Sequence, residues 1–496
     1  MPNTELLFMS AARAAALIRA GKLSPVEYVN AVLDGIERAN PRLNAFSHVM
    51  ANHARRSAMA AEQSVRRGDT LGPLHGVPVS IKDLVEVDGV PFRRGSAIFA
   101  EAIGEQDDIV VTRLRDAGAI IIGKTTTPEF GVKALTDGPS FGITRNPWNL
   151  ERTPGGSSGG AAAAVAAGLG PLALGTDGAG SIRGPAAACG LVGLKPTLGV
   201  VPREDPADAL GNTSYAGPIT RTVTDAALMH AVLAGDGSPA PLSLDPWAIS
   251  PAPQGRLMPR LIGAEATGLR VGYFARCANP RVAADVTTNT RAMLATLADL
   301  GAEIEEVTEA FDWAEPAGRV LYQAGIAVGM AKYLPQWQNQ MDPVTLAFAE
   351  RGQAFTLAEW RHAEWARTTL FRAVQGLFER YDMLVMPTMS RTALPVGHDA
   401  ANDQVLVDGE PTGITRQGWT AYQYPFNLTG HPALTIPSGF GTDGLPTGLQ
   451  IVGPWGSETD ILRLGAMLEQ ARPWAQHRPP TNGAAGNGAA GNGAAA

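Results

Sequence analysis

Two glycine-rich turns carry serines whose type and spacing suit nucleophilic chemistry. The first turn, GGSSGG, contains Ser157 and Ser158, and the second, GTDGAGSIRGP, contains Ser181 twenty-four positions after Ser157. Glycine allows positive φ and lets backbone N–H groups approach a bound group closely. The successive N–H groups of residues 178–181 could form a nest aimed at a developing oxyanion. A serine hydroxyl in such a turn is a candidate nucleophile, provided that a base takes its proton.

The segment between the two turns favours a functional reading of the serines. No charged residue lies between Arg152 and Asp177. The small residues from Ala161 to Leu174 predict a buried helix followed by a short strand. Two turns that bracket buried elements suit a serine nucleophile with an oxyanion hole better than they suit simple packing.

Further motifs along the chain carry a family resemblance. Besides the two serine turns they are LHGVPVSIKDL (74–84), GAIIIGKTTTPEF (118–130), NPWN (146–149), GLKPTLGVVP (193–202), GPITRTVTDAA (217–227), NLTGHPALTIPSG (427–439) and GLPTGLQIVGP (444–454). In these motifs the chain resembles the amidase signature family over nearly its whole length. The resemblance implies an enzyme that hydrolyses the C–N bond of a small linear amide through an acyl-enzyme and uses no cofactor.

The resemblance also assigns roles to individual residues. Ser181 is the acyl-forming nucleophile, Ser157 is a bridging serine with a cis peptide bond to Gly156, and Lys82 is the base. Lys82 lies on a mostly apolar strand, where desolvation can lower its pKa from about 10.4 toward 7–8. Gly131 and Ser158 are assigned to substrate binding, with Ser158 as a supporting hydrogen-bond partner. The predicted oxyanion donors are Gly178, Ala179, Gly180 and Ser181.

The same residues have structural alternatives. Ser157 and Ser181 could each cap the helix that follows, and Lys82 could be a strand-end lysine that reaches solvent. Asp83 follows Lys82 directly but points to the opposite strand face, so we do not expect it to be the partner of Lys82. Asp177 is expected to form an ion pair with Arg183 that shapes the second turn.

Two matches to known motifs lack the context that those motifs need. GGSSG (155–159) fits the nucleophile elbow G-x-S-x-G with His431 as a tempting base, but this reading leaves the Ser181 turn unexplained. GAIIIGKT (118–125) fits the P-loop expression, but its middle residues are strand material and Pro128 interrupts the expected helix. The histidines and cysteines show no spacing typical of a metal site.

The choice of amide is the least specified feature. Large aromatic residues gather in the C-terminal half, and if two or three line the pocket, a bulky aryl or apolar amide is favoured over glutamine. They are Trp313, Trp337, Trp360, Trp419, Tyr422 and Tyr424. We find no acidic and basic pair that would hold a free amino acid, which favours a stand-alone amidase. The alternative is the glutaminase-type subunit of a tRNA-dependent amidotransferase, and carbamates and esters also stay open as substrates.

The elements that position these residues alternate between helix and strand. Ser24-Pro25-Val26-Glu27 predicts a capped helix to about Asn40, and residues 76–84 alternate as a strand does. Residues 108–117 are expected to be helical and 119–122 to be a buried strand. A strand–helix–strand unit is predicted over 269–274, 282–299 and 303–307, with a later strand at 383–387. Alternating strands and helices indicate an α/β layered fold.

The expected architecture is a single large α/β/α domain with a mixed central sheet flanked by helices, over residues 1–480. Within it we expect a helical N-terminal arm at about 5–67, a catalytic core at about 70–235, and a variable helical region at about 310–425. A Pro-rich surface connection is expected over 234–262. Residues 481–496 are a low-complexity repeat that is expected to be disordered.

Composition limits the function classes. The 496 residues are 45% hydrophobic, enough for a large core, and the net charge of −7 gives no electrostatic footprint for nucleic acid or an anionic membrane. Two cysteines, Cys189 and Cys277, fit a reducing cytoplasm. The N-terminus shows no signal peptide pattern. A cytoplasmic enzyme is therefore expected, with no nucleic-acid or membrane partner and with its quaternary state, a homodimer included, left open.

Overall fold

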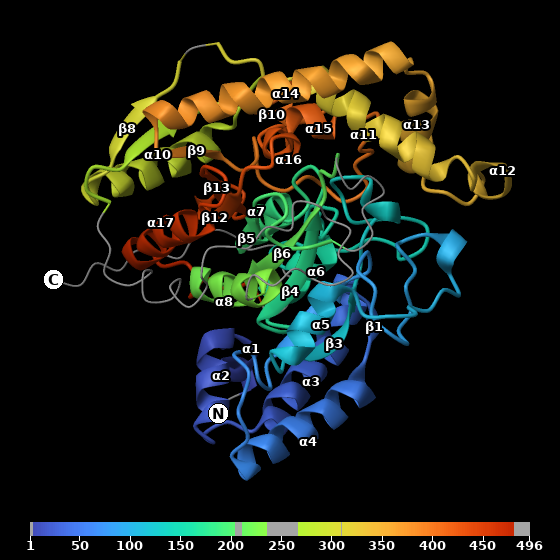
Figure 1. Cartoon of the computed structure of the whole chain (residues 1–496), viewed down its shortest axis with the longest axis vertical. Coiled ribbons are helices and arrows are strands. Elements are labelled where there is room, and N and C mark those ends of the chain that lie inside the picture. The colour runs from blue at the N-terminus through green and yellow to red at the C-terminus, as the bar shows by residue number, and fades with distance from the viewer. Residues whose placement is uncertain (1–2, 204–210, 236–265, 309, 481–496) are drawn as a thin grey trace.

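Figure 1 shows the computed structural model of the chain, which describes residues 3–203, 211–235, 266–308 and 310–480. The predicted Pro-rich connection falls almost entirely outside the described residues, and so does the C-terminal repeat 481–496.

A mixed sheet of eleven strands forms the centre of the described structure, in the order β1-β3-β2-β4-β6-β5-β12-β13-β9-β7-β8. The strands are β1 (Phe46–Val49), β2 (Pro78–Lys82), β3 (Ile120–Thr125), β4 (Leu172–Asp177), β5 (Val192–Lys195), β6 (Tyr215–Thr220), β7 (Arg270–Tyr273), β8 (Glu303–Glu306), β9 (Met383–Pro387), β12 (Ala433–Phe440) and β13 (Pro446–Val452). Strands β3, β2 and β4 run parallel to one another, and so do β9, β7 and β8. The strands between these two groups are antiparallel, so the sheet is mixed as expected.

The two faces of the sheet bury different helices, because successive side chains of a strand point to opposite faces. Ala173 and Ile219 are cross-strand partners and pack against the small-residue helices α6 (Gly159–Ala166) and α7 (Arg183–Cys189). On the other face, Leu194 of β5 belongs to an apolar cluster with side chains of three further helices. They are α8 (Val223–Ala234), α10 (Ala284–Asp299) and α17 (Glu458–Ala471). The structure is therefore layered α/β/α.

The N-terminal helices pack together beside the edge of the sheet that holds β1 and β3. They are α1 (Asn3–Leu7), α2 (Ala11–Arg19), α3 (Pro25–Leu43) and α4 (Ala51–Arg67). The Oγ of Ser24 accepts hydrogen bonds from the backbone N–H groups of Val26 and Glu27, so the predicted cap forms. The helix continues three residues beyond the predicted end at Asn40. A fifth helix, α5 (Ile109–Asp116), precedes β3 as predicted.

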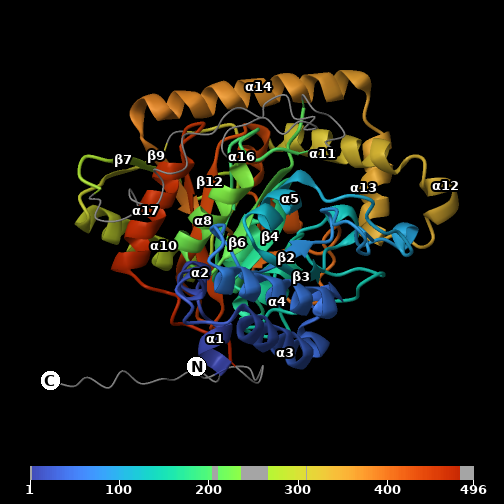
Figure 2. The ribbon, with the colours of Figure 1, turned by 60° about the horizontal axis from the view of Figure 1, so that its bottom comes forward.

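The C-terminal half adds a helical layer on the opposite side of the molecule. Figures 1 and 2 show the long helix α14 (Leu357–Arg380) along one border, with α11 (Glu315–Met330) and α13 (Pro343–Gln353) beside it. The remaining short elements are α12 (Leu334–Trp337), α15 (Thr415–Gly418), α16 (Tyr424–Leu428), and the hairpin β10 (Leu406–Val407) with β11 (Glu410–Pro411). Thr356 and Glu359 form a reciprocal capping box at the start of α14. In the described part of the chain, no helix is both long and apolar enough to cross a membrane.

Candidate active site

The parallel pairing of β2 with β4 brings the candidate residues to one edge of the sheet. Lys82 is the last residue of β2, and Thr176 and Asp177 are the last residues of β4. Because parallel strands end at the same edge, residues 95 positions apart in sequence meet there. The two serine turns precede α6 and α7, and the backbone N–H of Ser158 donates to the carbonyl of Ser181 at 3.2 Å. The two turns are therefore held side by side.

Lys82 is completely buried among hydroxyl groups. Its Nζ lies 2.7 Å from Ser157 Oγ, 2.9 Å from Ser158 Oγ and 2.9 Å from Thr176 Oγ1. Burial lowers the pKa of Lys82 well below its usual value, although the nearby Asp177 carboxylate acts in the opposite direction. The alternative of a strand-end lysine reaching solvent is therefore wrong.

The first serine turn has an unusual backbone around Ser157. The Gly156–Ser157 peptide bond is cis, as the family resemblance implied, and Gly155 has φ of +80°. Gly131, with φ of +71°, lies against this turn, and a Cβ at Gly131 would stand 3.0 Å from Ser157 Oγ. Gly131 thus lies beside Ser157, with no room for a side chain between them.

Ser158 is committed to its protein partners. It is fully buried, its Oγ donates to the carbonyl of Thr176 at 3.1 Å, and the Thr176 N–H donates to that Oγ. These contacts engage the Ser158 hydroxyl with Lys82 and Thr176, and its assignment to substrate binding stays a prediction. Ser158 is thus a hydrogen-bond partner that supports Lys82 and Thr176.

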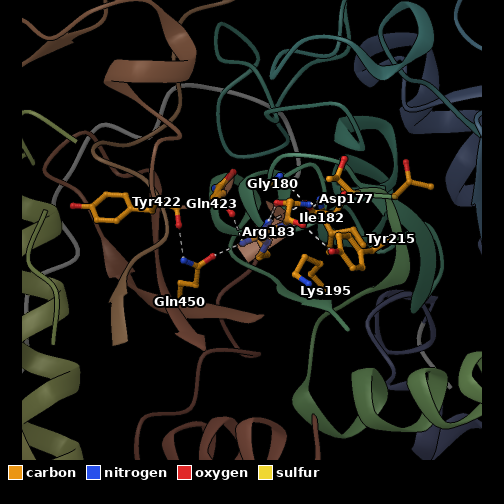
Figure 3. A network of polar contacts seen from close by, with 12 residues as sticks. Asp177, Gly180, Ile182, Arg183, Lys195, Tyr215, Tyr422, Gln423 and Gln450 are labelled. Carbon is orange, nitrogen blue, oxygen red and sulfur yellow. Dashed lines mark hydrogen bonds and ion pairs between the residues drawn. The ribbon is translucent and has the colours of Figure 1, made fainter. Parts of the chain in front are cut away.

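The second turn is wrapped around the Asp177 carboxylate (Figure 3). Arg183 donates to both oxygens of Asp177, through Nη2 at 2.9 Å and Nε at 3.0 Å. The backbone N–H groups of Gly180 and Ile182 donate to the same carboxylate at 2.6 and 3.1 Å. Burial alone would raise the pKa of Asp177, but Arg183 outweighs that effect and holds the pKa well below its usual range. The predicted ion pair is confirmed.

The remaining donors of Arg183 bind the side-chain amides of Asn427 and Gln450 and a backbone carbonyl. Arg183 Nη2 donates to the Oδ1 of Asn427, and Nη1 donates to the Oε1 of Gln450 at 2.8 Å and to the carbonyl of Gln423. The Nδ2 of Asn427 in turn donates to Asp177 Oδ1 at 2.8 Å. Every donor of the buried guanidinium therefore has a partner, which is the condition for a buried charge to be tolerated.

Of the four predicted oxyanion donors, Gly180 is the one whose N–H is bonded to Asp177 in the described structure. The Gly180 N–H is engaged by Asp177 at 2.6 Å, so it is not available to an oxyanion in this conformation. Gly178 and Ala179 line a cleft, and Ala179 and Ser181 line a small adjoining pocket. Ser181 is half-buried, whereas Ser157 is 2% exposed. In the described structure the hydroxyls of Ser157 and Ser181 are not hydrogen-bonded to each other.

The cleft has a volume of about 890 Å³ and the pocket at Ser181 about 30 Å³, and the two share Ala179, Tyr322 and Arg416. Much of the cleft is apolar and comes from α11, α13 and α14. Of the six predicted aromatics, Trp360 and Tyr424 line it, whereas Trp313, Trp419 and Tyr422 are buried in the core. The two cavities are also lined by three aromatic residues that were not predicted from the sequence: Tyr322, Phe348 and Phe355.

The alternatives weighed from sequence fail on geometry. The N-cap residues of α6 and α7 are Ser158 and Ile182, and neither makes a side-chain capping bond, so neither Ser157 nor Ser181 caps the helix that follows it. His431 is buried against Phe371 and Phe378, its Nδ1 contacts Thr429, and burial lowers its pKa to about 3. It is therefore not the base of a nucleophile elbow.

The P-loop match is also a structural coincidence. Residues 120–125 form the buried strand β3 instead of a phosphate-binding loop. Lys124 is fully buried, pairs with Asp83 at 3.3 Å and donates to the carbonyl of Val85 at 2.7 Å. Asp83 thus faces away from Lys82, as its place on the strand predicts.

Comparison with known proteins agrees with this fold. The family model described as Amidase matches residues 27–462. An acylamidase from Rhodococcus erythropolis is 37% identical, with 97% of this chain and 98% of the relative covered. A glutamyl-tRNA(Gln) amidotransferase component from Acidothermus cellulolyticus is 34% identical, with coverage of 94% and 95%. A bacterial aryl acylamidase of known structure superposes with a TM-score of 0.85 at 30% identity, covering 95% of this chain and 97% of that one.

Fold and sequence together define a hydrolase that acts on amide C–N bonds. The chain belongs to the amidase signature family, as its motifs indicated.

Proposed function

We propose that this amidase works through a Ser181 acyl-enzyme with Lys82 and Ser157 as its proton relay. The observation that carries the proposal is the 2.7 Å contact between the buried Lys82 amine and Ser157, beside the turn that bears Ser181. A lysine kept neutral by burial can act as a base near neutral pH.

The hydrogen bonds around Lys82 support Ser157 as the hydroxyl that gives up a proton. A neutral amine has two N–H donors and one lone pair. Ser158 spends its own proton on the Thr176 carbonyl, so its Oγ accepts from Lys82. Thr176 Oγ1 can accept the second N–H at 2.9 Å. The remaining lone pair then faces the hydroxyl of Ser157.

The proposed reaction follows from this arrangement. Ser157 passes its proton to Lys82 and takes the proton of Ser181, whose Oγ attacks the amide carbonyl after a rotation of its side chain toward Ser157. The backbone N–H groups of Gly178, Ala179 and Ser181 stabilise the oxyanion. Ser157 then protonates the departing nitrogen, the C–N bond breaks, and water hydrolyses the acyl-enzyme to the acid.

The proposed substrates are bulky aryl or apolar amides. The cleft beside the oxyanion turn is lined by Leu321, Val328, Phe355, Leu357 and Trp360, which supports an apolar group of considerable size. The relatives named as an acylamidase and an aryl acylamidase support the same class. Carbamates and esters present the same carbonyl to Ser181 and are included in the proposal.

The second candidate is a glutaminase-type subunit of a tRNA-dependent amidotransferase. It is favoured by the 34% identity to the glutamyl-tRNA(Gln) amidotransferase component. The apolar cleft argues against it, since glutamine would leave that surface uncovered. Glutamine-specific hydrolysis that requires a copurifying partner would support this candidate, whereas turnover of aryl amides by the isolated chain would exclude it.

The deciding experiment is active-site labelling with a fluorophosphonate followed by peptide mass spectrometry. The proposal expects the adduct on Ser181, lost in Ser181→Ala and strongly slowed in Lys82→Ala. An adduct on Ser157 or Ser158 would overturn the proposed nucleophile. We further propose a cytoplasmic location, tested by fractionation, because both cysteines are unpaired in the structure.

A further inference from the structure

One cation that lines the cleft, Arg416, has neither an ion pair nor a hydrogen bond in the described part of the chain. Arg416 lies on α15 and lines both the 30 Å³ pocket of Ser181 and the 890 Å³ cleft. Its side chain is half-buried and is shared by the linings of the two cavities.

Aromatic packing holds this guanidinium in place. Its Cζ lies 3.8 Å from the centroid of the Tyr322 ring and 5.9 Å from that of Phe348. Tyr322 is itself fixed, because its hydroxyl donates to the carbonyl of Val132 at 2.6 Å. A guanidinium stacked on a ring keeps its planar edge of N–H donors free. Arg416 is thus preorganised to bind an acceptor in the plane of that edge.

Each of the other charged groups of the two cavities has at least one interaction partner within the protein, although the Nη1 of Arg203 is buried without a hydrogen bond. Lys133 pairs with Asp137 and with Asp342, the latter at 2.7 Å. Arg367 donates to the carbonyls of Leu428, Gly211 and Asn212. Arg203 also has an interaction partner within the protein, and Glu364 pairs with Arg361.

The charge of the lining is therefore one-sided. Among the described residues that line the two cavities, Lys133, Arg203, Arg367 and Arg416 are cations and Glu364 is the carboxylate. The nearest acid on the neighbouring helix, Glu315, accepts from Gln417 and pairs with Arg319 instead of Arg416. An anionic ligand group is favoured in such a place, and a carboxylate matches the planar fork of arginine in two hydrogen bonds.

We propose that Arg416 is a specificity residue that binds a carboxylate of the substrate next to the scissile amide. The inference rests on the proposed function, because it names the class of amide that the Ser181 site takes: an acid-bearing aryl or apolar amide. The apolar cleft holds the body of the substrate, and Arg416 holds its charge where pocket and cleft join.

The test uses two pairs of anilides in which a carboxylate is replaced by a methyl ketone of similar shape. 4-Acetamidobenzoate and 4-acetylacetanilide differ on the amine side of the scissile bond. N-Phenylsuccinamate and the anilide of 4-oxopentanoic acid differ on the acyl side. Release of the aniline gives kcat/KM for each, with the full chain as wild type, Arg416→Gln, Arg416→Lys, and Arg372→Gln as a control that removes an exposed arginine outside the cleft.

The wild type is expected to prefer the acid of at least one pair by tenfold or more, mainly through KM. Arg416→Gln should reduce that preference to about one while hydrolysis of the ketone stays within about threefold, and Arg416→Lys should retain part of it. Arg372→Gln should keep the full preference. The pair that responds identifies the side of the substrate that carries the acid.

The inference would be overturned by no preference for either acid in the wild type, or by a preference that survives Arg416→Gln. Equal losses on acid and ketone would assign Arg416 a structural role and also count against it. Failure of the proposed function is a separate observation, namely ketone hydrolysis that persists in Ser181→Ala. Calorimetric binding of the acids and ketones to Ser181→Ala tests the preference without turnover, so the inference can be judged even if the chemistry differs.

Discussion

Replacing Asp177 with asparagine tests whether the buried ion pair holds the second serine turn. The carboxylate accepts from the Arg183 guanidinium and from the backbone N–H groups of Gly180 and Ile182, and the side chains of Asp177 and Arg183 are both 0% exposed. Asparagine keeps the shape of the aspartate side chain, but its NH₂ group replaces one carboxylate oxygen and cannot accept hydrogen bonds from these donors. Removing one partner of a buried pair leaves the other charge uncompensated, which costs about 3–5 kcal/mol.

We therefore expect Asp177→Asn to lose about 3–5 kcal/mol of unfolding free energy, measured in guanidinium by tryptophan fluorescence. Because Gly180 and Ile182 flank Ser181, the turn should also shift, and a displacement of about 1 Å costs roughly a hundredfold in rate. The kcat on a neutral anilide is expected to fall by at least that factor.

The matched control is Asp382→Asn. Asp382 also pairs with an arginine through two hydrogen bonds, to Arg270, but the side chains are 39% and 47% exposed. Exposed pairs contribute about 1 kcal/mol or less, so this variant should remain near wild type. A loss in Asp177→Asn no larger than that of Asp382→Asn would refute the argument that burial decides the cost.

The pH dependence gives the same prediction an independent check. Arg183 overcomes the effect of burial and lowers the pKa of Asp177, so its contribution to stability is present above the unfolded-state pKa of about 3.9. It is lost only as the pH falls through the lower folded-state value. The gap between wild type and Asp177→Asn should thus be equal at pH 5 and pH 8, and a gap that closes between those values would contradict the assignment.

Three further outcomes follow from the site. Lys82→Met should reduce kcat/KM for an anilide at least tenfold more than kcat/KM for the matched phenyl ester, because the leaving group of an ester needs little protonation. Equal losses on the two substrates would count against the proton relay. Since burial lowers the pKa of Lys82, wild-type kcat/KM should fall with acid as the amine protonates, with its midpoint well below the usual lysine value of about 10.4, and a rise that begins only near pH 10 would show an unperturbed lysine. Gly131→Ala should slow turnover at least tenfold, because its Cβ would stand 3.0 Å from Ser157 Oγ and 2.7 Å from Leu84 Cδ1. The control Gly89→Ala should leave turnover unchanged, because Gly89 has a similar φ of +68° but open space around it.

The architecture was predictable because local patterns and sheet geometry agree. The strand pattern at Val77–Ile81 and the capping residue Ser24 each determine an element by themselves. The parallel pairing of β2 with β4, which brings Lys82 to the turn before α7, was not predicted, because no local pattern encodes it. Ends of elements were less accurate, as α3 shows by running on to Leu43, because packing extends a helix past its local signals.

Details within the turns escaped the sequence because they depend on which donor meets which acceptor. Glycine at 180 predicts a freely available N–H, yet the structure gives that N–H to Asp177. Two neighbouring serines look equivalent in GGSSGG, yet only Ser158 points at the Thr176 carbonyl. These hydrogen-bond partners are determined by how β4 and the two turns approach one another in three dimensions. No local sequence pattern encodes that approach.

The role that we propose for Arg416 could not be predicted from the sequence. Nothing in TGITRQGW distinguishes it from the other arginines of the chain, most of which lie at the surface or pair with acids. Its character arises from Tyr322, 94 positions earlier, which packs beneath the guanidinium, and from Glu315, which bonds to Gln417 instead. A residue becomes a recognition site when its neighbours fix its position but leave its charge unpaired, and that condition is a property of the packed α11–α15 region. On this proposal, substrate choice depends on the most loosely patterned part of the sequence, whereas the proposed bond-breaking chemistry depends on the most recognisable part.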